Sequence, residues 1–226
     1  PEGLPLMRMF NPDGTEDFCG NGLLCTMAYL YEKGESRAGT MDILSPAGRH
    51  DGRVRPARSD RYAVTGDVLK PRFEPQDIPV KLPGRQILDE PKEIGGRTFP
   101  ISCVNVGTTH TVIYSDHDVP EGTFREISPL LETHKAFPER TSVLWCRVEG
   151  RDRIWMRIWE RGVGETFACG TGACAALAVA ASTGRAGRKA VVSSRGGKVT
   201  VEWPTGRSVR ITAEVHKVYS GKYLPS

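Results

Sequence analysis

The segment that most constrains this chain is the alanine-rich stretch 173–181, whose residues are all apolar. A helix with apolar side chains around its whole circumference leaves no face for water, so the rest of the protein must enclose it. Gly170 and Gly172 precede the stretch, and Gly184 follows it at a position where a left-handed residue commonly ends a helix. The sequence therefore predicts a buried helix that begins beside Cys169.

The chain contains the same pattern a second time, 150 residues earlier. A Cys-Gly-x-Gly segment again leads into an apolar stretch that stops at a glycine. The pairs at this offset are Cys19 and Cys169, Gly14 and Gly164, Gly20 and Gly170, Gly22 and Gly172, and Gly34 and Gly184. Five pairs at one offset indicate an internal duplication. Because related units usually pack with pseudo-twofold symmetry, we expect the two cysteines to share one cleft.

A cysteine at a helix N-terminus has unusual surroundings. The first turn offers unpaired N–H groups and the positive end of the helix dipole, which stabilise a nearby anion by about 0.3 to 1 kcal/mol, or about 2 when partly buried. The same field lowers the pKa of a thiol from about 8.5 toward neutrality. We therefore expect Cys19 and Cys169 to act as one thiolate base and one thiol acid on opposite faces of a carbon atom. Such a pair would serve an epimerase or racemase without a cofactor.

The alternative is that Cys19 and Cys169 are ordinary buried thiols of a duplicated core. A helix start flanked by glycines is a poor place for inert packing, because the glycines let a ligand approach the backbone. The catalytic interpretation is therefore the stronger one.

Both cysteine segments resemble the two signature segments of the diaminopimelate epimerase family. The first spans 11–22 and reads Asn-Pro-Asp-Gly-Thr-Glu-Asp-Phe-Cys-Gly-Asn-Gly, and the second spans 160–174. The resemblance implies an α/β (α+β) fold of two pseudo-symmetric domains, each a curled mixed sheet around a central hydrophobic helix. It places the active site in the cleft between them. It also implies an isomerase that interconverts LL- and meso-diaminopimelate in cytoplasmic lysine and peptidoglycan precursor synthesis.

The candidate site residues follow from these motifs and from the helix chemistry. The candidate catalytic residues are Cys19, Cys169, His110 and Glu160. Backbone N–H groups at both helix starts would hold the α-carboxylate of the substrate, and residues near the motifs would bind its other end. The candidate substrate-binding residues are Asn11, Gly20, Asn21, Thr108, Ser142, Glu160, Arg161, Gly170 and Thr171.

Two of these positions depart from the family. The segment 107–110, Gly-Thr-Thr-His, resembles the family's Gly-Asn-Pro-His loop, in which the asparagine binds substrate and the histidine supports a catalytic cysteine. Thr108 stands at that asparagine position, and Ser142 replaces an asparagine that binds the far end of diaminopimelate. A buried substrate group left unpaired costs about 1 to 3 kcal/mol. A racemase or epimerase of another amino acid, such as histidine or hydroxyproline, therefore stays open as an alternative.

The predicted organisation is an N-terminal domain at 1–97, joined by the C-terminal segment 214–226, and a second domain at 98–213. Family members begin with a strand and a Gly-Asn-Asp-Phe loop that contacts substrate, and we expect the first domain to lack this strand. That expectation supports a further alternative, a catalytically silent amino-acid-binding homologue. The C-terminal segment resembles the family's last strand, and Tyr219 matches a tyrosine that contributes to a homodimer.

Composition argues against several other classes of protein. The formal net charge is only +4, and the one basic stretch, 49–61, lacks the interleaved aromatic residues that stack on nucleic-acid bases. No apolar run reaches the 18 or so residues of a membrane span, and no secretory signal begins the sequence. Six cysteines without an extracellular pattern suggest reduced thiols in the cytoplasm. Their spacings do not match zinc-binding motifs, so we expect no metal.

The remaining chain reads mostly as short strands. We expect strands or hairpins at 6–10, 41–43, 52–55, 62–64, 98–106, 111–114, 143–148, 153–159, 190–192, 198–201 and 208–213. The proline-rich segment 71–91 predicts an irregular connection. A helix is expected at 121–136, interrupted by Pro129.

Overall fold

The computed structural model describes residues 3–11, 14–36, 38–58, 60–222 and 224. Within these ranges the helices are α1 (Gly20–Glu32), α2 (Glu121–Glu132) and α3 (Gly170–Ser182), with a short 3-10 helix, η1 (Pro75–Asp77). The strands are β1 (Thr40–Ser45), β2 (Gly48–Arg58), β3 (Arg61–Asp67), β4 (Glu90–Ile94), β5 (Arg97–Asn105), β6 (Thr109–Tyr114), β7 (Ser142–Gly150), β8 (Arg153–Glu160), β9 (Gly164–Thr166), β10 (Lys189–Ser194), β11 (Gly197–Glu202) and β12 (Arg210–His216). None of the described helices is long and apolar enough to cross a membrane.

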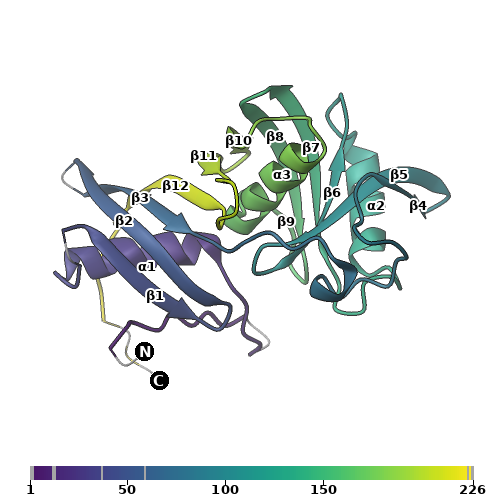
Figure 1. Ribbon diagram of the computed structural model, residues 1–226. Coiled ribbons are helices and arrows are strands. Elements are labelled where there is room, and N and C mark those ends of the chain that lie inside the picture. Colours follow the sequence, from purple (N-terminus) through teal and green to yellow (C-terminus); the bar gives the residue numbers. More distant parts are fainter. Residues whose placement is uncertain (1–2, 12–13, 37, 59, 223, 225–226) are drawn as a thin grey trace.

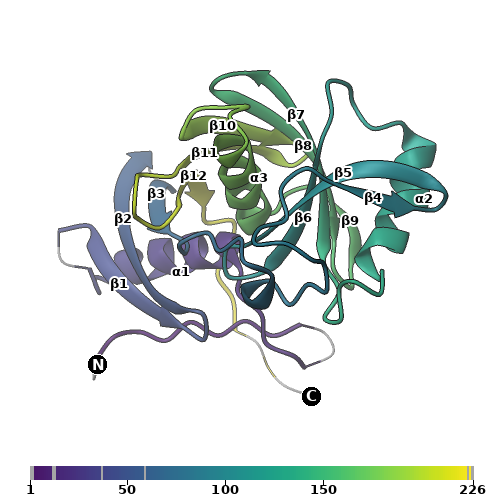
Figure 2. The same ribbon diagram turned by 45° about the vertical axis from the view of Figure 1, so that its right-hand side comes forward.

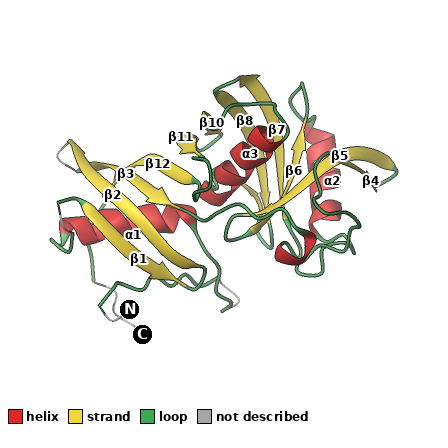
Figure 3. Cartoon of the chain, in the orientation of Figure 1, coloured by secondary structure: helices red, strands yellow, loops and turns green. Residues whose placement is uncertain are grey.

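The strands of the described chain pair into one mixed sheet that curls around two different helices. Its order is β1-β2-β3-β12-β11-β10-β8-β7-β6-β5-β4, with β9 beside β8. The pairs β6–β7 and β8–β10 are parallel, and the other pairs are antiparallel. Helix α1 contacts β2, β3 and β12, whereas α3 contacts strands from β5 to β12 (Figures 1 and 3). The mixed α+β fold predicted from the family resemblance is confirmed.

The two central helices begin and end in nearly the same way. Cys19 and Cys169 are extended N-cap residues, with φ/ψ of −126°/113° and −140°/114°. Each sulfur accepts a hydrogen bond from the N–H three residues later, on Gly22 or Gly172, at 3.3 Å. The glycines that follow the helices have positive φ, as a C-terminal stop requires: +78° at Gly34 and +74° at Gly184. The duplication inferred from spacing thus extends to backbone conformation.

The predicted burial of the alanine-rich helix is confirmed. Every residue from Gly170 to Ala180 in α3 is buried. Helix α1 differs, because one face reaches the surface, where Tyr29 is exposed and Cys25 is a free thiol. A second core lies between α2 and the strands β4 to β7, on the far side of the sheet from α3 (Figure 2). Helices α2 and α3 therefore cover opposite faces of this part of the sheet.

Three local expectations need correction. The helix expected at 121–136 ends at Glu132, where the Thr133 hydroxyl donates to the Pro129 carbonyl at 2.9 Å. Pro129 lies inside the helix: it removes one hydrogen bond in the preceding turn but does not interrupt α2, which continues for three more residues. The segment 6–10 forms only isolated bridges, at Leu6 and Phe10, and no strand. Strands β4 and β9 were not expected: β4 begins inside the segment 71–91 that was expected to be irregular, and the three residues of β9 are too few to show an alternating pattern.

The proposed boundary at 97/98 separates two strands that pair with each other. Strand β4 pairs with β5 along its whole length. By contrast, β12 pairs with β3 over seven positions, from Arg210 with Asp67 to His216 with Arg61, so part of the C-terminal segment joins the first unit. The strand pairing favours a division just after β3, and the two-domain organisation itself stays a prediction.

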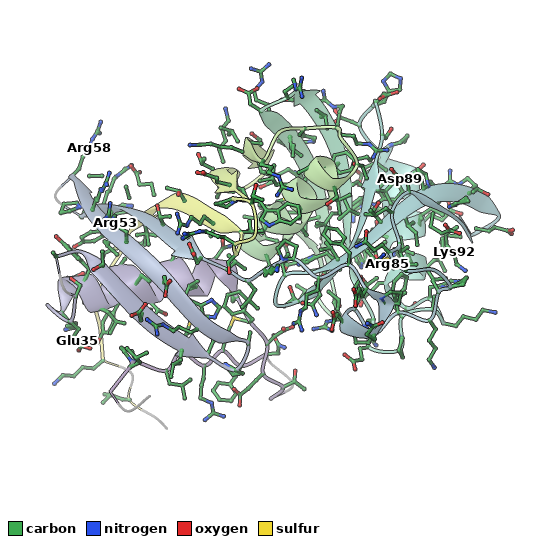
Figure 4. The ribbon with its side chains drawn as sticks, in the orientation of Figure 1. Glu35, Arg53, Arg58, Arg85, Asp89 and Lys92 are labelled. Atoms are coloured by element: carbon green, nitrogen blue, oxygen red, sulfur yellow. The ribbon has the colours of Figure 1, made fainter. Side chains whose placement is uncertain are left out.

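Within the basic stretch 49–61, residues 49–58 lie in β2 and Arg61 begins β3. Arg53 and Arg58 project from β2 (Figure 4). Arg49 pairs with Asp42 at 2.7 Å, and Arg61 pairs with Glu214 at 2.7 Å. These contacts are those of a polar hairpin face.

The enclosure of α3 predicts a large penalty for truncating its one leucine. Leu177 is fully buried, so Leu177→Ala should lower the free energy of unfolding by about 2 to 5 kcal/mol, measured by urea denaturation. Leu130→Ala, at a half-exposed position of α2, is the matched control and should cost about 1 kcal/mol or less. Equal losses in the two variants would contradict the enclosure of α3.

Candidate functional site

The N-termini of α1 and α3 meet backbone against backbone. A Cβ atom on Gly170 would lie 3.1 Å from the Asn21 nitrogen and 3.3 Å from the Gly20 carbonyl carbon. A Cβ atom on Gly20 would lie 3.2 Å from the Thr171 nitrogen. Only glycine at both positions allows this approach without displacing the backbone. The ribbon views show the two helix starts converging at this point (Figures 1 and 2).

A cleft of about 850 Å³ opens at this meeting point. It is lined by all twelve candidate residues: Asn11, Cys19, Gly20, Asn21, Thr108, His110, Ser142, Glu160, Arg161, Cys169, Gly170 and Thr171. Sequence reasoning did not single out the other lining residues: Met9, Thr15, Glu16, Asp17, Phe18, Arg140, Gly162, Val163 and Ala168. Tyr219 is not part of the cleft and is exposed.

Most of the overlooked residues lie within or next to the two cysteine motifs. Their motif positions were visible, but nothing in the sequence indicated which side chains face the cleft. Arg140 is different, because it comes from the connection after α2 and reaches the cleft through the tertiary fold alone. No motif pointed to it.

The four N–H groups at the very start of the helices have no acceptor within their own helix. They belong to Gly20 and Asn21 in α1 and to Gly170 and Thr171 in α3. Among the described residues, none of these N–H groups donates a hydrogen bond outside its helix. No carbonyl or carboxylate group of the described chain therefore accepts from these N–H groups, as expected for donors that bind an anion.

The two cysteines differ in their surroundings. Cys19 is partly exposed, whereas Cys169 is buried. Burial first, and then the charge of the nearby Glu160 carboxylate, raise the pKa of the Cys169 thiol to about 12, against smaller opposing effects of Thr171 and Gly172. The expectation that the helix end brings a thiol pKa toward neutrality is wrong for Cys169, because loss of water outweighs the helix field. Cys169 is thus a protonated thiol in this structure.

His110 is a buried, neutral histidine. Burial lowers its pKa to about 3, and the positive charge of Arg161 contributes in the same direction. Its Nε2 lies 2.9 Å from the Thr108 hydroxyl. Such an imidazole keeps one N–H donor and one acceptor nitrogen across the physiological pH range.

An ion pair closes one side of the cleft. Arg161 donates to Asp17 at 2.7 Å, and the two residues come from the two cysteine motifs, 144 positions apart. The Arg161 side chain also donates to the Glu139 carbonyl at 3.1 Å, and its backbone N–H donates to the Ser142 hydroxyl at 3.1 Å. Ser142 therefore fixes the backbone of Arg161, and the Arg161 guanidinium faces the cleft with a carboxylate already beside it.

The Glu160 carboxylate accepts a hydrogen bond from the Thr166 hydroxyl of β9. This contact holds Glu160 at the end of β8, near Cys169. In the described part of the chain, no group of three or more His, Cys, Asp or Glu side chains has an arrangement that would hold a metal ion.

Comparison with known proteins identifies the family. The family profile described as diaminopimelate epimerase matches residues 102–218. The diaminopimelate epimerase of Pelotomaculum thermopropionicum is 40% identical over 225 residues, which cover 96% of this chain and 78% of the relative. The chain belongs to the diaminopimelate epimerase family. A second member, from Moorella thermoacetica, is 38% identical over 219 residues, with the same coverage of 96% and 78%.

Solved structures extend the likeness of this diaminopimelate epimerase family member to more distant folds. A probable proline racemase from Agrobacterium radiobacter superposes with a TM-score of 0.69 at 15% identity, covering 97% of this chain and 72% of that chain. A hydroxyproline epimerase from Agrobacterium vitis gives a TM-score of 0.64 at 19% identity, covering 94% and 68%. At these identities the likeness is one of fold.

The contact between helix starts predicts an unusual response to alanine. Gly→Ala near a helix start is normally neutral or slightly stabilising. Gly170→Ala should instead lower the free energy of unfolding by about 1 to 3 kcal/mol, because the new methyl group meets the backbone of Asn21. Gly122→Ala in α2, where a Cβ atom meets nothing within 4 Å, is the control. Chemical denaturation of this pair checks the prediction, and a Gly170→Ala protein as stable as its parent would refute it.

The buried neutral state of His110 predicts a pH effect on stability. Its folded pKa of about 3 lies below the ordinary 6.5, so the unfolded chain takes up the proton first. The contribution of His110 to stability is present above pH 6.5 and is lost as the pH falls toward 3. Unfolding measured between pH 7 and 4 should be less pH-dependent in His110→Asn than in the parent. His117→Asn, at an exposed position, should keep the parental slope.

Proposed function

We propose that this protein interconverts LL- and meso-diaminopimelate by proton transfer between Cys19 and Cys169. Family membership supports the substrate, since the relatives in the comparison carry that activity in their names. The observation that carries the chemistry is that both N-cap cysteines line one cleft, at the point where their helices touch. The proposal requires no cofactor.

The unpaired N–H groups at the helix starts bind the α-carboxylate of the substrate. Gly20, Asn21, Gly170 and Thr171 offer donors from two directions, and both helix dipoles present their positive ends to the same point. A carboxylate held there needs no arginine. As the α-proton leaves, negative charge spreads onto the carboxylate, and the same donors stabilise it.

The proton balance is simple. One cysteine, as thiolate, takes the α-proton and becomes a thiol, and the C–H electron pair stays on the substrate as a carbanion. The other cysteine, as thiol, gives its proton to the opposite face and becomes the thiolate. Burial favours the protonated form of Cys169, so this thiol is the acid in one direction of the reaction, in which Cys19 takes the α-proton. The reverse reaction exchanges these roles.

The far end of the cleft suits a second amino-acid group. Arg161 would bind the distal carboxylate, and the carboxylates of Asp17 and Glu160 would attract the distal ammonium. Asn11, whose amide donates to the Thr15 hydroxyl at 3.1 Å, lies on the same wall. Because Asp17 already occupies Arg161, a distal carboxylate has to share or displace that partner.

The biological setting is part of the same proposal. A diaminopimelate epimerase serves lysine and peptidoglycan precursor synthesis in the cytoplasm. The family's dimer contact at the position of Tyr219 suggests a homodimer, and the exposure of this tyrosine suits such a contact.

Hydrogen exchange tests the proposal directly. In deuterated water under reducing conditions, the protein should incorporate deuterium at the α-carbon of LL- and meso-diaminopimelate. Cys19→Ala and Cys169→Ala should each lose at least about a hundredfold in rate, because each removes one of the two proton carriers. Cys25→Ala, which removes a free thiol of α1 outside the cleft, should keep the parental rate.

Other outcomes would select the alternatives. Exchange with histidine or hydroxyproline but not with diaminopimelate would replace the substrate and keep the mechanism. Binding of an amino acid without any exchange, unchanged in Cys19→Ser, would establish a silent binding protein.

A further inference from the structure

A row of hydroxyl groups joins the buried His110 to Cys169. The Thr108 hydroxyl lies 2.9 Å from His110 Nε2 and donates to the Thr171 hydroxyl at 3.2 Å. Thr171 Oγ1 lies 3.4 Å from the sulfur of Cys169. Three contacts of hydrogen-bond length therefore connect a ring nitrogen on β6 with the thiol at the start of α3.

The direction of these hydrogen bonds follows from the other ring nitrogen. His110 Nδ1 is buried and has no hydrogen-bond partner among the described residues. A buried N–H without an acceptor is rarer in proteins than a buried acceptor without a donor, so the neutral ring carries its hydrogen on Nε2. Nε2–H then donates to Thr108. Because a hydroxyl has one hydrogen to give, Thr108 gives its own to Thr171, and Thr171 gives its own to the Cys169 sulfur.

This orientation makes the two catalytic sulfurs unequal. The sulfur of Cys169 accepts from both the Thr171 hydroxyl and the Gly172 N–H. Within the described chain, the sulfur of Cys19 accepts only from the Gly22 N–H. Donors to sulfur favour the thiolate, and both donors lower the pKa of Cys169 against the effect of burial.

Among the charged and titratable groups around Cys169, Glu160 opposes the thiolate. Glu160, at the end of β8, raises the pKa of Cys169 by its negative charge. Cys174, about one turn further along α3, is a buried thiol whose own pKa is raised, first by burial and then by the charge of Cys169. Arg161 acts on His110 and keeps the imidazole neutral. A buried thiol beside a carboxylate therefore depends on its hydrogen-bond donors to release a proton.

We infer that Thr108 is a positioning residue for Cys169: it holds the hydroxyl hydrogen of Thr171 on the sulfur and so gives the thiolate a second donor. The Thr108 hydroxyl hydrogen is then committed to Thr171 and is not available to the substrate. This gives Thr108 a role different from the direct substrate contact expected from the asparagine it replaces. The inference rests on the proposed function only in naming Cys169 as a proton carrier.

Alkylation of the thiol tests the inference without turnover. At a pH far below the pKa of a thiol, its rate with iodoacetamide is proportional to the thiolate fraction. Loss of one donor should therefore slow alkylation of Cys169 about tenfold at pH 8, which corresponds to a rise of about one unit in its pKa. The variant is Thr108→Val, which keeps the shape and removes the hydroxyl. Peptide mass spectrometry reads Cys169 and Cys19 in the same sample, and Cys19 should keep its rate.

Three further variants sharpen the result. Thr108→Ser retains a hydroxyl and should restore alkylation of Cys169 to within about twofold of the parent. Thr171→Val should slow Cys169 at least as much as Thr108→Val does, and the double variant should add little, since both act through one hydrogen bond. Thr108→Ala carries the same expectation as Thr108→Val and replaces it should valine prevent folding.

Two outcomes would overturn the inference. One is an unchanged rate at Cys169 in Thr108→Val and Thr108→Ala. The other is equal slowing of Cys169 and Cys19, which would mean a general change of the cleft. Failure of the parent to exchange diaminopimelate protons is a separate result: it would reject the proposed substrate and leave the alkylation measurement intact.

Discussion

The contact between Gly20 and Gly170 is the constraint on which the rest of the site depends. Helix termini usually need partners for their first N–H groups, and here the backbones of two termini approach each other closely. The contact places four unpaired donors and two N-cap sulfurs around one point. The main chain supplies the anion-binding donors of the site, and two glycines make that possible.

Duplication gives the two halves the same backbone but not the same surroundings. The caps of α1 and α3 agree in angles and in the 3.3 Å hydrogen bond to sulfur. The two caps differ in how deeply they are buried, because α3 is enclosed by strands from β5 to β12 while α1 is open on one face. The packing around two similar helices therefore leaves Cys19 partly exposed to water and buries Cys169.

The motifs made much of the site predictable. The shared offset of Cys19 and Cys169 led to one cleft, and the loop before His110 could be placed in it from the family resemblance. Burial of α3 followed from its composition. The contact of Asp17 with Arg161 could not be foreseen, because it depends on how two distant segments approach. The raised pKa of Cys169 could not be foreseen for a related reason: a sequence shows the helix start but not the water that packing removes.

The pairing of β12 with β3 has a consequence for synthesis of the chain. The first unit contains α1 and β1 to β3, but its sheet is completed by residues 210–216, close to the other end of the sequence. During translation the apolar face of α1 therefore stays exposed on one side until residues 210–216 have been synthesised and can pair with β3. Such a long-range pairing slows folding and prolongs exposure of apolar surface. The intervening unit, from β4 to β11, has its own local strand pairs and can form while the first unit is still incomplete.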